Sequence, residues 1–171
     1  MLRKLSWQDA DAFLDHYRSS LSSQWPFVII PPSHSCKTLM ESGKAPVLLA
    51  ILATATYSDG GLQLVCETVF RHFIAFKTFI NCEQSLPILQ SLLVFLAWHH
   101  YAYRPRMADL YRNCQVLVEH GMHDLVEKRP GQAQSSDQSL EVQRALLGCY
   151  YLSTHGLNVR SPGVCESARA P

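Results

Sequence analysis

Closely spaced cysteine pairs are missing from this sequence. Its six cysteines occur singly, and no two stand closer than 16 positions, the spacing of Cys66 and Cys82 and of Cys149 and Cys165. A structural zinc site needs thiolates separated by two or a few residues, so the spacing argues against a zinc cluster. We expect no signal peptide, and therefore free thiols in a reducing compartment, most of them small core residues. The cysteines are Cys36, Cys66, Cys82, Cys114, Cys149 and Cys165.

Excess charge of one sign and long hydrophobic runs are missing too. The 15 Lys and Arg residues nearly balance the 14 Asp and Glu residues, so no net field attracts a polyanion and the chain alone is not expected to bind duplex DNA. The longest apolar runs, residues 46–57 and 86–98, fall short of the roughly 20 residues of a membrane-spanning helix. With 47% apolar and 17% charged residues among 171, the chain can still bury the core of one domain.

Catalytic signatures are also missing. The sequence has no G-x-S-x-G elbow, no phosphate-binding glycine loop and no H-E-x-x-H run. The remaining candidates are the histidines His99, His100, His120 and His123. The last two straddle Gly121, where a helix should end, and no carboxylate completes a known site. We therefore expect no enzyme, no metal and no cofactor, with a helical enzyme using His99 or His120 as the third alternative.

Helical periodicity is what the sequence does contain, and no segment alternates polar and apolar residues as a strand would. We expect an all-α bundle of about six to seven helices without a sheet. A proline-rich stretch, residues 25–32, should form an extended connector. The expected helical segments are residues 6–24, 35–41, 46–55, 62–80, 86–98, 106–121 and 139–152.

The spacing of apolar residues also predicts which faces turn inward. Residues 46–55 are apolar nearly all round, which places that helix centrally. Gly60-Gly61 should break the chain before the next helix, and Gly148 should weaken the last one. The inward stripe of residues 62–80 is expected to comprise Val65, Cys66, Val69, Phe73, Phe76 and Ile80. In the last helix the inward set is Val142, Ala145, Leu146, Cys149, Tyr150 and Leu152.

We expect one domain. Residues 1–156 should form a helical domain, interrupted near residues 127–138 by a mobile loop that has no periodicity. Residues 157–171, polar and proline-containing, are expected to be a disordered tail.

Several motifs follow one another in a recognisable order. Trp25-Pro26-Phe27 comes after the first helix, residues 46–53 read PVLLAILA, residues 89–98 read LQSLLVFLAW, and residues 121–123 read GMH. This order resembles the fungal-specific transcription factor domain, the middle homology region of fungal zinc binuclear cluster transcription factors. The resemblance spans roughly residues 7–156. Because the zinc cluster is absent, the chain is expected to be a truncated or separately encoded piece.

One stretch departs from the family pattern. Residues 141–150 correspond to a helix that carries an arginine run and two tryptophans in the family. Here only Arg144 remains of the run, and Leu147 and Gly148 replace the tryptophans.

The resemblance implies transcription regulation in the nucleus by a regulatory domain without catalytic chemistry. Its partners would be proteins, either a transcription factor or a co-regulator, in a homo- or heterodimer, with no direct DNA binding and no membrane. The alternative is a stand-alone interaction module or remnant. Several aromatic and methionine residues could line a ligand cavity, or they could be ordinary core residues. Two arginines could contact an acidic partner, or they could lie on a solvated surface. The candidate positions are Trp98, Tyr101, Tyr103, Met107, Tyr111, Arg104 and Arg106.

Overall fold

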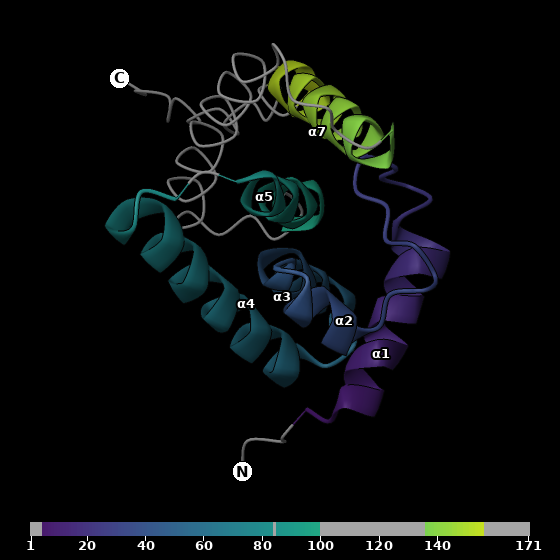
Figure 1. The fold of residues 1–171 in the computed structure, drawn as a ribbon. Helices are drawn as coiled ribbons and strands as arrows, with labels where there is room; N and C mark the ends of the chain where they lie inside the picture. The colour runs from purple at the N-terminus through teal and green to yellow at the C-terminus, as the bar shows by residue number, and fades with distance from the viewer. Residues whose placement is uncertain (1–4, 84, 100–135, 156–171) are drawn as a thin grey trace, which may run out of the picture.

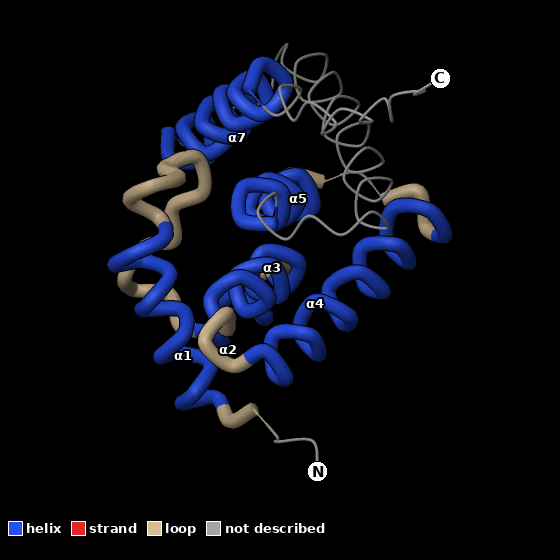
Figure 2. Tube along the Cα trace, turned by 180° about the vertical axis from the view of Figure 1, so that it is seen from behind, coloured by secondary structure: helices blue, strands red, loops and turns tan. Residues whose placement is uncertain are grey.

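The computed structural model describes residues 5–83, 85–99 and 136–155, and all regular structure within these ranges is helical (Figures 1 and 2). The expected all-α fold is therefore confirmed over the described part of the chain. None of the helices described there is long and apolar enough to cross a membrane.

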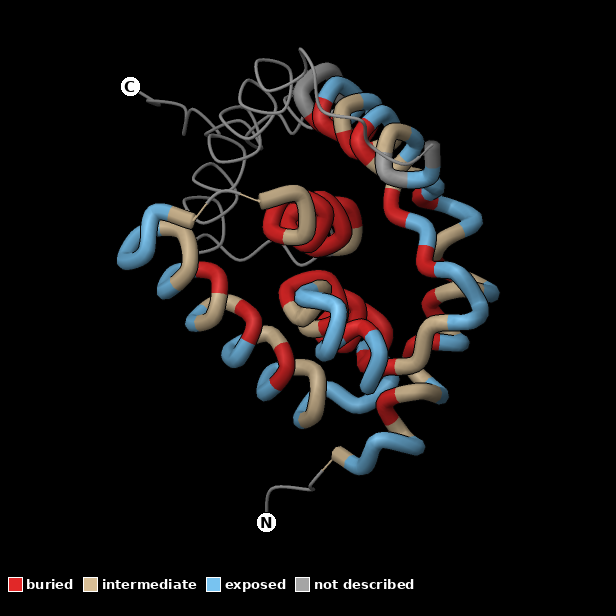
Figure 3. The backbone as a smooth tube through the Cα atoms, viewed as in Figure 1, coloured by how far each residue is buried: buried red, intermediate tan, exposed pale blue. Residues whose placement is uncertain are grey.

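Two helices form the centre of the bundle. Helix α3 (Ala45–Ala55) contacts α5 (Leu86–His99), α1 (Trp7–His16) and α4 (Gly60–Ala75), while α7 (Ser136–His155) packs on α5 (Figure 1). Helices α3 and α5 are buried along most of their length (Figure 3), because both are apolar on every side and only a central position removes all those surfaces from water. The central placement predicted for residues 46–55 is confirmed.

The N-terminal part of the chain wraps this centre. The Ser6 hydroxyl caps α1 by accepting the Asp9 amide at 3.1 Å, and α1 continues into a π-helical turn, η1 (Tyr17–Leu21). The connector that follows contains no regular helix up to α2 (Cys36–Glu41), as its prolines predict. The buried Tyr17 hydroxyl fixes it by donating to the Val28 carbonyl at 2.9 Å.

The beginning of α4 corrects one expectation. Gly60 and Gly61 do not break the chain but form the first helical turn, because the Asp59 carboxylate caps the helix by accepting the Leu62 amide at 3.0 Å. Helix α4 then continues into a second π-helical turn, η2 (Phe76–Ile80). The helix thus starts two residues earlier than predicted.

The inward face of α4 is a second correction. The line that packs against α3 and α5 is Cys66, Phe70 and Ile74, and the Phe70 and Phe95 rings lie with their centroids 4.7 Å apart. Four residues predicted to point inward are instead exposed, because the central helices meet a neighbouring face of α4. They are Val65, Val69, Phe76 and Ile80.

Helix α7 differs from expectation in three respects. It begins at Ser136, so the last residues of the expected loop 127–138 belong to the helix. Val142, Ala145, Cys149 and Leu152 are buried as predicted, Leu146 is half-buried, and Tyr150 is exposed. Gly148 is a close-packing position, because a Cβ built there would lie 3.0 Å from Phe27 Cβ and 3.3 Å from Leu93 Cδ1.

Three expected segments lie outside the described residues: the helix at 106–121, the first part of the loop at 127–135 and the tail at 157–171. The domain division remains an expectation.

Candidate functional site

Trp98 is the one described member of the predicted partner-facing set. It lies near the end of α5, is half-buried, and its indole Nε1 is buried without a hydrogen-bond partner. The predicted residues Tyr101, Tyr103, Arg104, Arg106, Met107 and Tyr111 lie outside the described residues. The same holds for His100, His120 and His123, and the side chain of His99 is likewise not described.

The thiols of the described helices are placed for packing rather than for reaction. Cys36, Cys66 and Cys149 are buried, and burial raises the pKa of all three thiols, to about 12 for Cys36 and Cys149. A raised pKa keeps a thiol protonated and therefore a poor nucleophile or metal ligand. Cys82 is exposed, and within the described ranges no three His, Cys, Asp or Glu side chains are grouped to hold a metal.

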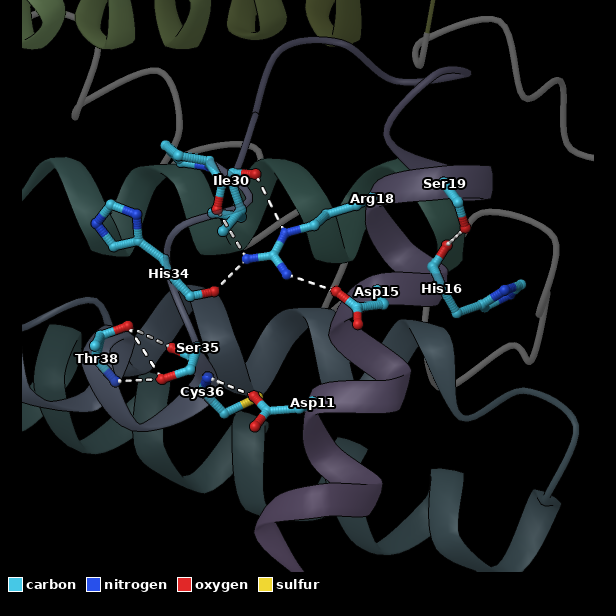
Figure 4. A network of polar contacts seen from close by, with 11 residues as sticks. Asp11, Asp15, His16, Arg18, Ser19, Ile30, His34, Ser35, Cys36 and Thr38 are labelled. Atoms are coloured by element: carbon cyan, nitrogen blue, oxygen red, sulfur yellow. Dashed lines mark hydrogen bonds and ion pairs between the residues drawn. The ribbon is translucent and has the colours of Figure 1, made fainter.

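A polar network ties the connector to α1 (Figure 4). The Arg18 guanidinium donates through Nε to the Ile30 carbonyl at 3.3 Å and through Nη2 to the Pro31 carbonyl at 2.9 Å and to the His34 carbonyl. Its Nη1 donates to Asp15 Oδ1 at 2.7 Å. A planar guanidinium suits such divergent acceptors, and every donor named here serves the fold. The network is therefore structural.

A neighbouring contact fastens α2 to α1. The Asp11 carboxylate accepts the Cys36 backbone amide at 2.7 Å, at the first residue of α2 (Figure 4). Burial is the largest cause of the raised pKa of the Cys36 thiol, and the hydrogen bond to Asp11 is the second. This carboxylate therefore also holds the connector in place.

A cavity of about 220 Å³ lies between the start of α1 and the α3–α4 turn, below the ~300–1,000 Å³ of typical ligand pockets. Its two carboxylates are already engaged: Asp59 caps α4, and Asp9 accepts the Ser6 hydroxyl at 2.8 Å. Its lining is Leu5, Asp9, Ala12, Phe13, Ser58, Asp59 and Leu62. The cavity therefore has little free polar chemistry with which to select a ligand.

The side of α4 that faces away from α3 carries exposed residues along the helix (Figure 3). We use the term α4 stripe for Val65, Val69, His72, Phe76 and Ile80. These positions follow one another at intervals of three or four residues, so they share a side of the helix. All five are exposed, and contiguous exposed apolar residues mark interaction surfaces.

Four of these five residues are predicted by the sequence to point inward, and the structure exposes them. A helix with two apolar faces can bury only one of them against a given neighbour. The histidine in the middle of the outer face was the one available signal, because a polar side chain is less expected in a core stripe.

Comparison with known proteins yields one informative match. The transcription factor himD of Aspergillus japonicus is 32% identical over 114 residues, which is 67% of this chain and 19% of that protein. Two thirds of this chain is thus similar to part of a fungal transcription factor. No protein-family model matches the chain, and no solved structure matches it. The chain spans about a fifth of the length of the curated relative.

Proposed function

We propose that this chain acts in transcription regulation, as a helical regulatory region of the kind found in fungal zinc-cluster transcription factors. The observation that carries the proposal is the 32% identity over 114 residues with a fungal transcription factor. The all-helical fold agrees with the domain that the sequence motifs resemble. The action is non-catalytic, takes place in the nucleus and depends on protein partners rather than on direct contact with DNA.

Two structural observations support a role in contacts rather than chemistry. Three of the four described thiols, those of Cys36, Cys66 and Cys149, are buried and have a raised pKa. The charged groups of the Arg18 network and the cavity serve helix caps and the connector. The α4 stripe also leaves an apolar surface exposed on the described part of the chain. Both features suit a protein that works by binding another protein.

The proposal is tested by tethering the full 171-residue chain to a heterologous DNA-binding domain in a fungal host that carries a matching reporter gene. We expect the fusion to raise or lower reporter output relative to the DNA-binding domain alone. Ile51→Asp, which places a charge at a fully buried position of α3, should abolish the difference because it unfolds the bundle. Lys37→Ala, at an exposed position, should leave the difference intact.

A fusion that is folded and nuclear yet leaves reporter output unchanged contradicts the proposal. Equal output from the chain and from the unfolded Ile51→Asp variant contradicts it as well.

A further inference from the structure

The α4 stripe has the composition of a helix–helix interface. Its side chains keep 38% (Val65), 47% (Val69), 51% (Phe76) and 70% (Ile80) of their surface exposed. His72 lies in the middle, between Val69 and Phe76. Four apolar positions around one polar position is a pattern that packs two helices together and fixes their register.

The stripe is complementary to itself when two copies run antiparallel. Val65 lies as far before the midpoint of the stripe as Ile80 lies after it, and the same is true of Val69 and Phe76. A two-fold axis at that midpoint therefore sets each valine against a larger side chain of the second copy. Alternating small and large side chains across facing positions lets the two surfaces interdigitate.

The charges beside the stripe do not oppose such pairing. Glu67 and Arg71 form an ion pair at 2.8 Å, and Lys77 and Glu83 form another at 2.7 Å. Two identical surfaces carry the same charges into the interface, so an excess of one sign beside the stripe would repel the second copy. Here the flanking charges are already neutralised within each copy.

The exposed area is of the right order for a dimer of modest strength. An aromatic side chain presents ~150–250 Å², so the exposed half of Phe76 offers on the order of 100 Å². The four apolar residues together offer on the order of 350 Å², against the ~800 Å² per partner, a little over half of it apolar, of a standard interface. The stripe therefore supplies most of the apolar centre of a small interface.

We propose that this chain forms a homodimer in which the α4 stripes of two copies pack antiparallel, with His72 next to the two-fold axis. The partner is a second copy because antiparallel pairing matches small with large residues along the whole stripe and because the flanking charges are internally paired. The proposal does not depend on the proposed function, and its test contains no transcriptional readout.

Sedimentation equilibrium of the full chain tests the proposal. The concentrations run from low micromolar to about 1 mM, and a dissociation constant at that upper limit is equivalent to ~4 kcal/mol of binding. The wild-type mass should rise with concentration from 19.3 kDa towards twice that value. Phe76→Asp should remain monomeric, because dimerisation would bury its charge at the interface. A wild-type chain that stays monomeric throughout overturns the proposal.

Phe79→Asp is the matched control. Phe79 belongs to the same π-helical turn as Phe76 and is 63% exposed. The i→i+5 bonding of a π-helix makes its turn longer than that of an α-helix, so a residue three positions after Phe76 lies to one side of the stripe. This variant should still dimerise. Equal loss of dimer in Phe76→Asp and Phe79→Asp contradicts the assignment to the stripe, and so does an unaffected Phe76→Asp.

Charge pairing at His72 supplies an independent test that does not depend on Phe76. His72→Asp and His72→Lys should each be monomeric, because the two-fold axis brings like charges together. An equimolar mixture of the two variants should dimerise, because opposite charges then meet at the axis. Circular dichroism checks that each variant is folded. A mixture that remains monomeric contradicts an antiparallel pairing about His72.

Discussion

At the scale of single residues, this protein is held together by groups whose role depends on their neighbours. Arg18 anchors three connector carbonyls and an aspartate at once. Trp25 and Phe27 of the same connector pack edge to face, with ring centroids 4.8 Å apart, and Tyr151 of α7 lies 5.3 Å from Trp25. A sequence of polar and proline-rich residues thereby becomes a fixed part of the fold.

Gly148→Ala should destabilise the protein although alanine is the better helix former. The added methyl group would lie 3.0 Å from Phe27 Cβ, an atom that moves only with the connector backbone. Overpacking costs about 1–3 kcal/mol, whereas the gain in helix propensity is at most about 1 kcal/mol. We therefore expect the free energy of unfolding to fall by about 1 kcal/mol, measured from urea denaturation midpoints.

Gly60→Ala is the matched control for that substitution. Gly60 lies in the first turn of α4, and no atom falls within 4 Å of a Cβ built there. The change should leave stability unchanged or raise it by up to about 1 kcal/mol. A rise in stability for Gly148→Ala would show that the connector yields easily to α7.

At the scale of elements, α3 and α5 form the framework against which the other helices are placed. Helix α7 is joined to it by the packing around Gly148 and by one long-range ion pair. Lys44 Nζ, in the turn before α3, lies 2.8 Å from Glu141 Oε1 of α7, and the two side chains are 23% and 25% exposed. Partial burial reduces solvent screening, so this pair should couple the two elements more strongly than a surface pair would.

A double-mutant cycle with Lys44→Met and Glu141→Gln measures that coupling. We expect each single change to lower the free energy of unfolding by about 1 kcal/mol and the double change to cost less than their sum. The exposed pair Lys37 and Glu41, 3.9 Å apart, is the control and should show no measurable coupling. Equal coupling in the two cycles would mean that Lys44 and Glu141 do not hold α7.

At the scale of the whole molecule, folding divides the cysteines into protected and accessible groups. Cys36, Cys66 and Cys149 come from α2, α4 and α7, and all three are buried. Cys82, between η2 and α5, is exposed and has a positive φ of 50°. Thiol chemistry is therefore a direct readout of whether the bundle is intact.

Iodoacetamide labelling of the native chain, mapped by peptide mass, should modify Cys82 rapidly. The three buried thiols should react only after unfolding, because they are inaccessible and their pKa is raised. Peptide mapping separates these sites from Cys114 and Cys165, which lie outside the described residues. Labelling of Cys36 or Cys149 at the rate of Cys82 would contradict the packing described here.

The same thiols predict that the protein loses stability in alkali. Burial raises the pKa of Cys36 and Cys149 from 9.0 to about 12, and it also raises that of the Tyr17 hydroxyl. Above pH 9 the unfolded chain therefore binds fewer protons than the folded chain. This contribution to stability is complete below pH 9 and is lost as the pH rises towards 12. Urea midpoints should fall over that window, and a midpoint that stays constant would contradict the prediction.

The sequence by itself determined the fold class of the described part of the chain, the central position of residues 46–55 and the start of the first helix at Ser6. These features depend on local chemistry: helical periodicity, a serine before the first apolar stripe and prolines that cannot continue a helix. It also indicated the likeness to fungal transcription factors, through the order of its motifs, which the similarity to himD supports in general terms.

Only the tertiary structure decided which face of α4 is buried. Its helix has two apolar faces, one through Cys66, Phe70 and Ile74 and one through Val65 and Phe76, and periodicity cannot choose between them. The choice was made by the position of α3 and α5, whose surfaces meet the first face and leave the second to solvent. Tertiary packing also explains Gly148. Its low helix propensity predicts a weak point of α7, but in the structure it is the position where α7 packs closely against the connector.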